Sequence, residues 1–146
     1  AAMGADLAAP GQINTTGYTR AFAGSNGSDP IQDYVIFGYG TSEPGATAQA
    51  STSASLSLSA NELEITCLSG NVHELTWDAY DAWPAGLLEN YRGPASGATQ
   101  RVRRGGAWDS PSAACSLSAR AAVNAWTIDF TQGLHLVRNI PPGTCP

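Results

Sequence analysis

The residues of this chain best able to bind a metal ion or act as nucleophiles are Cys67, Cys115, Cys145, His73 and His135. The sequence has no CxxC pair and no cluster of cysteines with histidines, so a zinc site is not expected. Three cysteines allow at most one intrachain disulfide, and the sequence favours no particular pair. Neither histidine neighbours a serine or cysteine nucleophile, and no GxSxG motif is present. We therefore interpret both histidines as exposed or partly packed rings.

Three acidic residues, Asp78, Asp81 and Glu89, lie near one another in the sequence. A pair of carboxyl groups can hydrolyse a glycosidic bond when one donates a proton and the other attacks or activates water. Spacing alone is weak support for this chemistry, because acidic residues are common in surface loops. Glycosidase activity is therefore not predicted.

Trp126 lies in a polar stretch of the chain beside Ile128 and Phe130. Aromatic side chains placed among polar groups are frequent anchors for ligands, because they bury a large area and keep a polar edge. Two interpretations stay open. The segment either binds a ligand, or it packs against a neighbouring subunit or a small core of its own.

Composition and charge narrow the function classes. The net charge is −5, the chain has no lysine, and only 13% of its residues are charged. A nucleic-acid partner would require a basic face, so none is predicted. No apolar run is long enough to span a membrane. The low charge and the abundance of Ser, Ala, Gly and Thr are typical of secreted proteins, and we expect an extracellular, cell-surface or virion-surface location.

Many short strands joined by long loops are expected, with few helices. Strands are predicted over residues 34–39, 63–67, 75–79 and 102–108, and a closing strand over residues 134–137. Residues 112–125 are predicted to hold a short helical turn. The βαβ rhythm of a Rossmann or TIM architecture is missing, so the pattern favours an α+β fold. We predict an N-terminal arm (residues 1–30), one domain (residues 31–138) and a proline-stiffened tail (residues 139–146).

Two blocks of the sequence carry a family resemblance. RVRRGGAW is followed by Cys115, Arg120 and GLHLVR, and SGNVHELTWDAYDAW precedes it at residues 69–83. These blocks resemble the formylglycine-generating-enzyme (sulfatase-modifying factor) family, over roughly residues 20–138, without that family's N-terminal half. The resemblance implies a C-type-lectin-like fold, in which Trp77 and Trp108 belong to core motifs and are buried.

The resemblance also implies two metal sites, and this chain departs from both patterns. Copper-dependent members bind the metal with two cysteine thiolates. Cys115 matches the second position, but Ser110 stands at the first, and a hydroxyl is a poor ligand for a soft ion. The family's calcium site would take carbonyl groups of Gly70 and Val72 and the carboxylate of Glu74. Its preceding side-chain ligand falls on Cys67, so no cofactor is expected, and calcium stays possible.

Within this family, the chain is most similar to the variable proteins of diversity-generating retroelements, which use the same C-terminal segment as a binding surface. The similarity implies a non-catalytic ligand-binding and display module with a protein or glycan partner. Its binding face would comprise residues between RVRRGGAW and GLHLVR: Asp109, Ser110, Ser112, Ser116, Asn124, Trp126, Thr127, Phe130 and Thr131. Such a face would combine aromatic area with adaptable hydroxyl and amide groups.

Two alternative functions stay open at this stage. The first is a structural subunit of a cell-surface or virion assembly, a possible homo-oligomer in which Trp126 and Phe130 would be buried between subunits. The second is a residual formylglycine-generating-type oxidase, which would require metal uptake and an activity dependent on Cys115.

Overall fold

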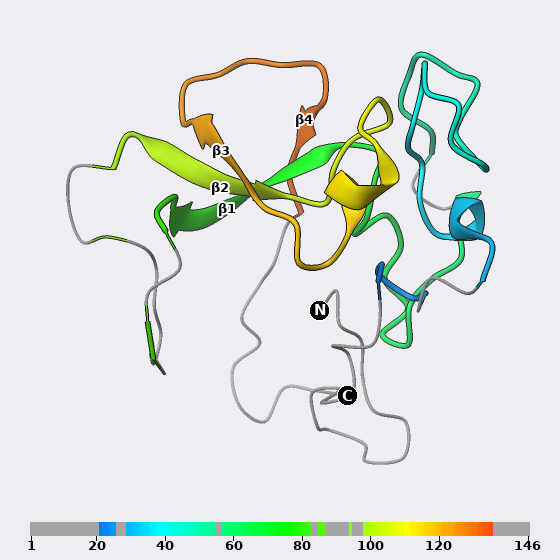
Figure 1. Cartoon of the computed structure of the whole chain (residues 1–146), viewed down its shortest axis with the longest axis horizontal. Coiled ribbons are helices and arrows are strands. Elements are labelled where there is room, and N and C mark those ends of the chain that lie inside the picture. Colours follow the sequence, from blue (N-terminus) through cyan, green and yellow to red (C-terminus); the bar gives the residue numbers. More distant parts are fainter. Residues whose placement is uncertain are drawn as a thin grey trace, which may run out of the picture.

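The computed structural model describes residues 21–25, 29–54, 57–82, 85–86, 94 and 98–135. Its regular elements are short and are joined by long irregular segments (Figure 1). In chain order they are the 3-10 helix η2 (Ile31–Asp33), β1 (His73–Ala79), β2 (Gln100–Arg104), the 3-10 helix η4 (Ser112–Cys115), β3 (Ala121–Asn124) and β4 (Gln132–Gly133). No helix among these residues is long and apolar enough to cross a membrane.

The four strands form one sheet in the order β3-β2-β1-β4. β2 pairs antiparallel with both β1 and β3, and β4 pairs parallel with β1. β3 and β4 are therefore the outer strands, although they are consecutive in the chain. Three inter-strand steps of about 4.8 Å separate them, roughly 14 Å in all. The connecting loop, residues 125–131, must cross the two central strands to join them.

The strands predicted over residues 75–79 and 102–108 are present with shifted ends, as β1 and β2. The closing strand predicted over residues 134–137 is not found where expected: β4 is Gln132–Gly133, residues 134–135 are not in a strand, and residues 136–137 lie outside the described residues. β1 includes the predicted residues 75–79, and its register with β2 shifts between Leu75 and Ala79. β2 ends at Arg104 rather than at residue 108, because Gly105 and Gly106 turn the backbone with positive φ. The predicted helical turn in residues 112–125 is present as η4, whereas β3 was not predicted.

The prediction of a strand over residues 63–67 is wrong. The alternation of apolar and acidic residues there belongs to a series of turns, with φ of 59° at Glu64 and 57° at Cys67. The Asn61 side chain organises them, since its Oδ1 accepts the N–H of Leu63 at 3.0 Å and that of Ile65 at 3.1 Å. Hydrogen bonds from an asparagine side chain to neighbouring backbone groups compete with strand pairing. In residues 63–67 these side-chain bonds replace strand pairing, and the segment forms turns.

The core lies beside the sheet, where segments distant in sequence meet. Phe22, Val35, Phe37 and Cys115 form one buried cluster. The run predicted as a strand over residues 34–39 supplies two of these side chains, yet its described strand pairing is limited to a bridge between Ile36 and Gly70. Burial in this run therefore comes from packing rather than from a full strand.

The packed structure begins N-terminal to the predicted boundary at residue 31. Phe22 is only 9% exposed and belongs to the core cluster. The backbone N–H of Ala23 donates to Ser69 Oγ at 3.1 Å, and that of Leu117 donates to the carbonyl of Ala21 at 2.9 Å. Residues 21–25 thus belong to the domain, within the segment predicted as an arm.

The predicted burial of the two tryptophans in the family motifs is half correct. Trp108 is 8% exposed, as predicted, whereas Trp77 is 76% exposed. The prediction for Trp77 is wrong because its ring lies outside the core, where the Arg101 guanidinium stands 5.7 Å from its centre. The same guanidinium donates to the carbonyl of Trp77 at 2.9 Å. A surface cation–π contact therefore replaces burial at this position.

Candidate functional site

Residues 105–108 form a tight turn after β2, which we call the glycine turn. Gly105 has a φ of 86° and Gly106 a φ of 70°, a region that favours glycine. A Cβ atom on Gly106 would lie 2.5 Å from Cys115 Sγ and 3.0 Å from Cys115 Cα. Both Ala107 and Cys115 are fully buried. The glycine turn and η4 therefore approach as closely as two backbones can.

Backbone hydrogen bonds connect the glycine turn to two other segments. The N–H of Trp108 donates to the carbonyl of Asn71 at 3.0 Å, and that of Tyr39 donates to the carbonyl of Trp108 at 2.9 Å. The N–H of Gly38 donates to the carbonyl of Ser110 at 2.8 Å. These bonds fix the position of the Trp108 ring, because they hold the backbone on both sides of it.

Trp108 is the centre of a row of three aromatic rings, Tyr39, Trp108 and Phe130, which we call the aromatic row. The Tyr39 and Trp108 ring centroids are 5.4 Å apart in an edge-to-face arrangement. Those of Trp108 and Phe130 are 6.1 Å apart with planes inclined by 31°. The buried Trp108 thus supports two rings that reach solvent, with exposed fractions of 40% for Tyr39 and 79% for Phe130.

The loop at residues 125–131 is held at both ends. At its start, the N–H of Thr127 donates to the carbonyl of Asn124 at 3.0 Å. At its end, Asp129 Oδ1 accepts both the N–H and the hydroxyl of Thr131 at 2.9 Å. These two bonds lower the pKa of the Asp129 carboxyl. Hydrogen bonds therefore hold the loop near Asn124 and Thr131, and among its apolar side chains Phe130 also contacts Trp108.

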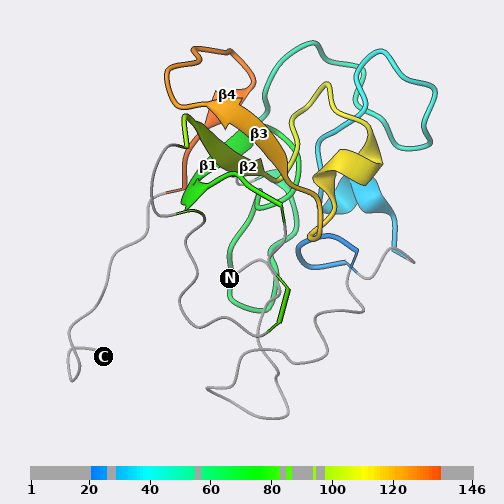
Figure 2. The ribbon, with the colours of Figure 1, turned by 60° about the vertical axis from the view of Figure 1, so that its left-hand side comes forward.

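The apolar side chains of this loop face solvent. Trp126 is 85% exposed, Ile128 is 100% exposed and Phe130 is 79% exposed. Figures 1 and 2 show the loop, in orange between β3 and β4, projecting from the periphery of the molecule. Neighbouring apolar groups of this size in the open are characteristic of interaction sites.

Most of the side chains predicted for the binding face lie on or beside this loop. Asn124, Trp126, Thr127 and Phe130 are exposed, and so is Asp109, which follows Trp108. Asp109 and Asp129 both act on the pKa of His73, which places these two acidic groups on the same part of the molecule. The exposed part of the predicted face is therefore contiguous with the aromatic row.

Two predicted residues are buried. Ser110 is 8% exposed, and its hydroxyl accepts the N–H of Ala107 at 3.1 Å. Its Oγ also lies 3.5 Å from His73 Nε2. Thr131 is 5% exposed, and its carbonyl accepts the N–H of His73 at 2.7 Å. Their polar groups hold the turn and the loop in place rather than facing a ligand.

Ser112 and Ser116 are the two predicted residues on and next to η4. The N–H of Ser112 donates to Glu43 Oε2 at 3.1 Å. The hydroxyl of Ser116 donates to the carbonyl of Ala113 at 2.9 Å. Both residues are half-buried; the Ser116 hydroxyl bonds within its own segment, and the backbone of Ser112 bonds to the distant Glu43.

The residues at the predicted calcium position do not fit this ion. Glu74 Oε1 lies 2.6 Å from Nδ1 of His135, so a cationic or donor ring already uses the carboxylate. The Gly70 carbonyl accepts the N–H of Val72 at 2.8 Å. The fourth position is Cys67, whose thiol pKa is raised by burial and by Glu74. Calcium takes six to eight oxygen ligands, and no acidic, histidine or cysteine cluster able to hold a metal ion occurs in the described residues.

Cys115 does not fit a soft-metal site either. Burial raises the pKa of its thiol to about 12, with Glu43 and Asp109 adding to the shift. Metal ligation requires the thiolate, and the first position of the family's copper pair is the hydroxyl of Ser110. Cys115 is a free cysteine, and Cys145 lies outside the described residues.

Comparison with known proteins agrees with this architecture. The family model of the sulfatase-modifying factor enzyme 1-like domain matches residues 7–140, and the chain belongs to this family. None of the curated proteins compared with the chain matches it.

Among solved structures, the chain is similar to Treponema denticola variable protein 1, with a TM-score of 0.67 and 24% sequence identity. The match covers 78% of this chain and 39% of that chain. The predicted α+β, C-type-lectin-like fold is confirmed.

Two parts of this surface were not predicted from the sequence. Tyr39 was assigned to a strand, and its place in the aromatic row depends on a hydrogen bond with Trp108, far away in sequence. Arg103 lies in the strand predicted over residues 102–108, yet its Nε is buried. The alternation of residues in β2 could not show this, because the covering segment comes from residues 114–121.

Proposed function

We propose that this chain is a non-catalytic ligand-binding module that displays the 125–131 loop and the aromatic row to a partner. The observation that carries the proposal is the exposure of Trp126, Ile128 and Phe130 on a loop whose ends are fixed by polar bonds. A loop held in this way keeps its path when its outward side chains differ. The fold it shares with Treponema denticola variable protein 1 supports a role as a variable protein.

A protein surface suits this site better than a glycan. Ile128 is fully exposed between two aromatic side chains, and an aliphatic group has no particular affinity for a sugar ring. Protein interfaces are enriched in Trp and Phe at their centres, with a polar rim. Asp109, Asn124 and Thr127 would supply such a rim. The proposed location is outside the cell or on its surface.

The absence of catalysis is part of the proposal. A protonated, buried Cys115 and a hydroxyl at Ser110 do not make a thiolate pair. At the family's calcium position, Glu74 Oε1 is bonded to His135, and Cys67 stands where the family has an oxygen ligand. We expect that adding calcium, or a chelator, leaves the thermal unfolding midpoint unchanged. A calcium-dependent rise in this midpoint would contradict the assignment.

Selection from a displayed peptide library tests the binding function. The wild-type domain should select peptides whose binding is abolished by Trp126→Ala combined with Phe130→Ala. The matched control is Trp77→Ala, which removes an equally exposed tryptophan from the sheet. Peptides that bind all three proteins equally, or no enrichment over a surface without the domain, would contradict the proposal.

A structural subunit is the second candidate. Leu75 and Trp77 on β1 are 39% and 76% exposed, and Leu134 is 68% exposed. Light scattering over a range of concentrations separates the two functions, because an assembly subunit would form large particles. A monomer supports the binding module, and an assembly dispersed by Trp126→Ala would favour the structural role.

A further inference from the structure

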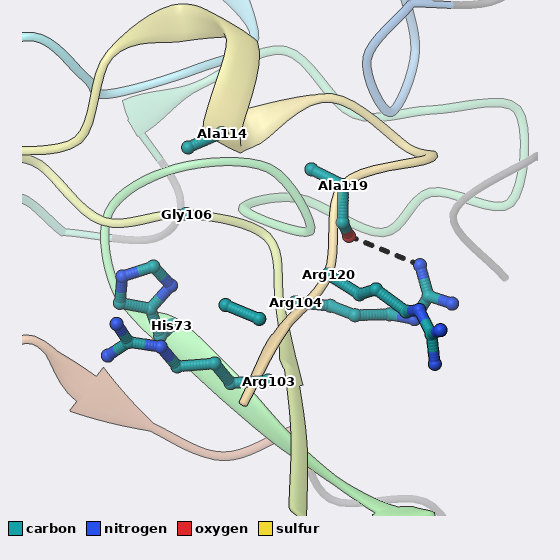
Figure 3. Close-up of a pocket in the computed structure, with 8 residues that line it drawn as sticks. His73, Arg103, Arg104, Gly106, Ala114, Ala119 and Arg120 are labelled. Atoms are coloured by element: carbon teal, nitrogen blue, oxygen red, sulfur yellow. Dashed lines mark hydrogen bonds between the residues drawn. The ribbon is translucent and has the colours of Figure 1, made fainter. Parts of the chain in front are cut away.

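A small pocket between the sheet and η4 contains a concentration of positive charge that the proposed function does not use. It has a volume of about 150 Å³ and is lined by His73, Arg103, Arg104, Gly106, Ala114, Ala119, Arg120 and Ala121. Three of the chain's seven basic residues therefore meet in one pocket, although the net charge is −5. We call it the Arg103 pocket; Figure 3 shows its lining.

Arg103 is the lining residue with an unused donor. Its Nε atom is buried and has no hydrogen-bond partner among the described residues. A buried donor left without an acceptor costs free energy, and more when the group is charged. Arg103 therefore has a buried donor for which the described part of the chain provides no acceptor.

The other two arginines are engaged within the protein. Nη1 of Arg104 donates to the carbonyls of Leu117 and Ala119, at 3.3 and 3.2 Å. Nη2 of Arg120 donates to the carbonyl of Asp81 at 2.7 Å, and its guanidinium stacks on Tyr80 at 4.9 Å. Figure 3 shows the Arg103 and His73 side chains at one side of the pocket and the two other guanidinium groups at the opposite side.

Carbonyl acceptors do not neutralise the guanidinium charge of Arg104, and Arg103 has no ion-pair partner among the described residues, so this part of the pocket is cationic. Two acidic side chains interact electrostatically with residues that line the pocket. Asp109 and Asp129 influence the pKa of His73, and Arg103 lowers the pKa of Asp129. Asp129 Oδ1 is already occupied by Thr131, and neither acid forms an ion pair with Arg103 among the described residues.

The remaining walls of the pocket are apolar and small. Ala114, Ala119 and Ala121 contribute methyl groups, and Gly106 contributes bare backbone. A strongly hydrated phosphate or sulfate would lose water against these walls without replacement. A carboxylate on a short carbon chain fits better, because its oxygens can accept from the Arg side chain while its methylene groups touch the methyls.

We propose that the Arg103 pocket binds a short aliphatic carboxylate, with Arg103 as its principal hydrogen-bond donor and the alanines as its apolar wall. The group comes either from a free small acid or from a glutamate or aspartate side chain of a bound protein. No residue of the 125–131 loop lines the pocket, so binding at this site can be measured apart from binding at the loop.

The Nε–H proton of Arg103 provides a direct test by NMR. Titrating the wild-type protein with propionate, at constant ionic strength with sodium chloride, should shift this resonance downfield and saturate. Inorganic phosphate should bind at least about tenfold more weakly, because the apolar walls provide no hydrogen bonds to replace its hydration shell. No shift, an equal shift with chloride, or tighter binding of phosphate would overturn the proposal.

Three variants test whether the propionate-dependent shifts arise in the Arg103 pocket. Arg103→Met should remove the propionate-dependent shifts of the Ala121 amide, whereas Arg101→Met, two residues away on the same strand, should retain them. Ala121→Leu fills the pocket without changing charge and should also prevent binding. If Arg103→Met and Arg101→Met weaken the response equally, general electrostatics explains it and the site is disproved.

A last comparison separates the two sources of the carboxylate. A glutamate capped as N-acetyl and C-terminal amide presents the same group on a peptide backbone. If it binds as tightly as propionate, the pocket admits a side chain of a protein. If the capped residue is excluded while propionate binds, the natural occupant is a free small acid.

Discussion

The glycine turn and the 125–131 loop lie in the same third of the chain, yet they are built in opposite ways. In the turn, Ala107 and Trp108 are buried, and Gly106 lies against Cys115 of η4 with no room for a Cβ atom. In the loop, Trp126 and Ile128 face solvent. The side chains of the turn are thus buried, whereas the loop is held by hydrogen bonds at its two ends.

This difference separates the residues that specify the fold from those that are free to differ. Close-packed backbones tolerate little change, since any added atom must displace a neighbour. A solvent-exposed side chain adds little to stability, so substitutions there have small effects. Trp108 links the two regions, because it is buried in the turn and supports Phe130 of the loop.

The largest expected effect is that of Gly106→Ala. The new Cβ would meet Cys115 at 2.5 and 3.0 Å and the carbonyl of Ala114 at 3.1 Å, at a φ of 70°. We expect a loss of more than about 2 kcal/mol in the free energy of unfolding, measured by urea denaturation. The control is Gly40→Ala, where φ is also positive but nothing lies within 4 Å. It should cost only about 1 kcal/mol for the backbone strain, and equal losses would show that close packing is not the cause.

Burial of Cys115 should protect its thiol from reagents. With a pKa raised to about 12, it has almost no thiolate at neutral pH. In a Cys145→Ser background, we expect Cys67 to be labelled in the native state and Cys115 to react only on unfolding. Mass spectrometry of the labelled peptides measures this. Early labelling of Cys115 would mean that the turn opens readily, and would remove the contrast with the loop.

His73 connects the turn, the loop and the Arg103 pocket, and its pKa is lowered chiefly by burial and then by Arg103. As the pH falls, His73 therefore takes up a proton near pH 6.5, its ordinary pKa, in the unfolded state, and only at a lower pH in the folded state. The stability contributed by neutral His73 is complete above that pH and is lost as the pH falls toward the lowered pKa. Subtracting the pH dependence of His73→Gln from that of the wild type should reveal this slope. A slope of opposite sign would mean that His73 is stabilised as a cation.

The smallest expected effect belongs to the loop. Trp126→Ala should change the free energy of unfolding by no more than about 0.5 kcal/mol, because the ring is 85% exposed. Urea denaturation beside Gly106→Ala gives the comparison within one protein. A loss of more than about 2 kcal/mol would indicate that Trp126 is buried in solution, as at a subunit interface.

The sequence predicted the parts of the fold that depend on local pattern. The alternation in residues 75–79 predicted β1 without long-range information. The strand predicted over residues 102–108 ran through the glycines that end β2, and the sequence left open whether Trp126 is exposed or packed. The turns at residues 63–67 could not be predicted, because Asn61 overrides the alternation through hydrogen bonds. The exposure of Trp77 and the burial of Ser110 depend on which segments cover them. Those contacts arise only in the folded chain.

The division between scaffold and display loop is tested most directly by two matched libraries. One randomises Trp126, Thr127, Ile128 and Phe130, and the other randomises Ala107, Trp108, Ser110 and Cys115. The measurement is the fraction of displayed variants that resist proteolysis under native conditions. The account predicts that most variants of the loop library resist proteolysis, and that few variants of the library at the four buried positions do. Equal survival of the two libraries, or a collapse of the loop library, would contradict it.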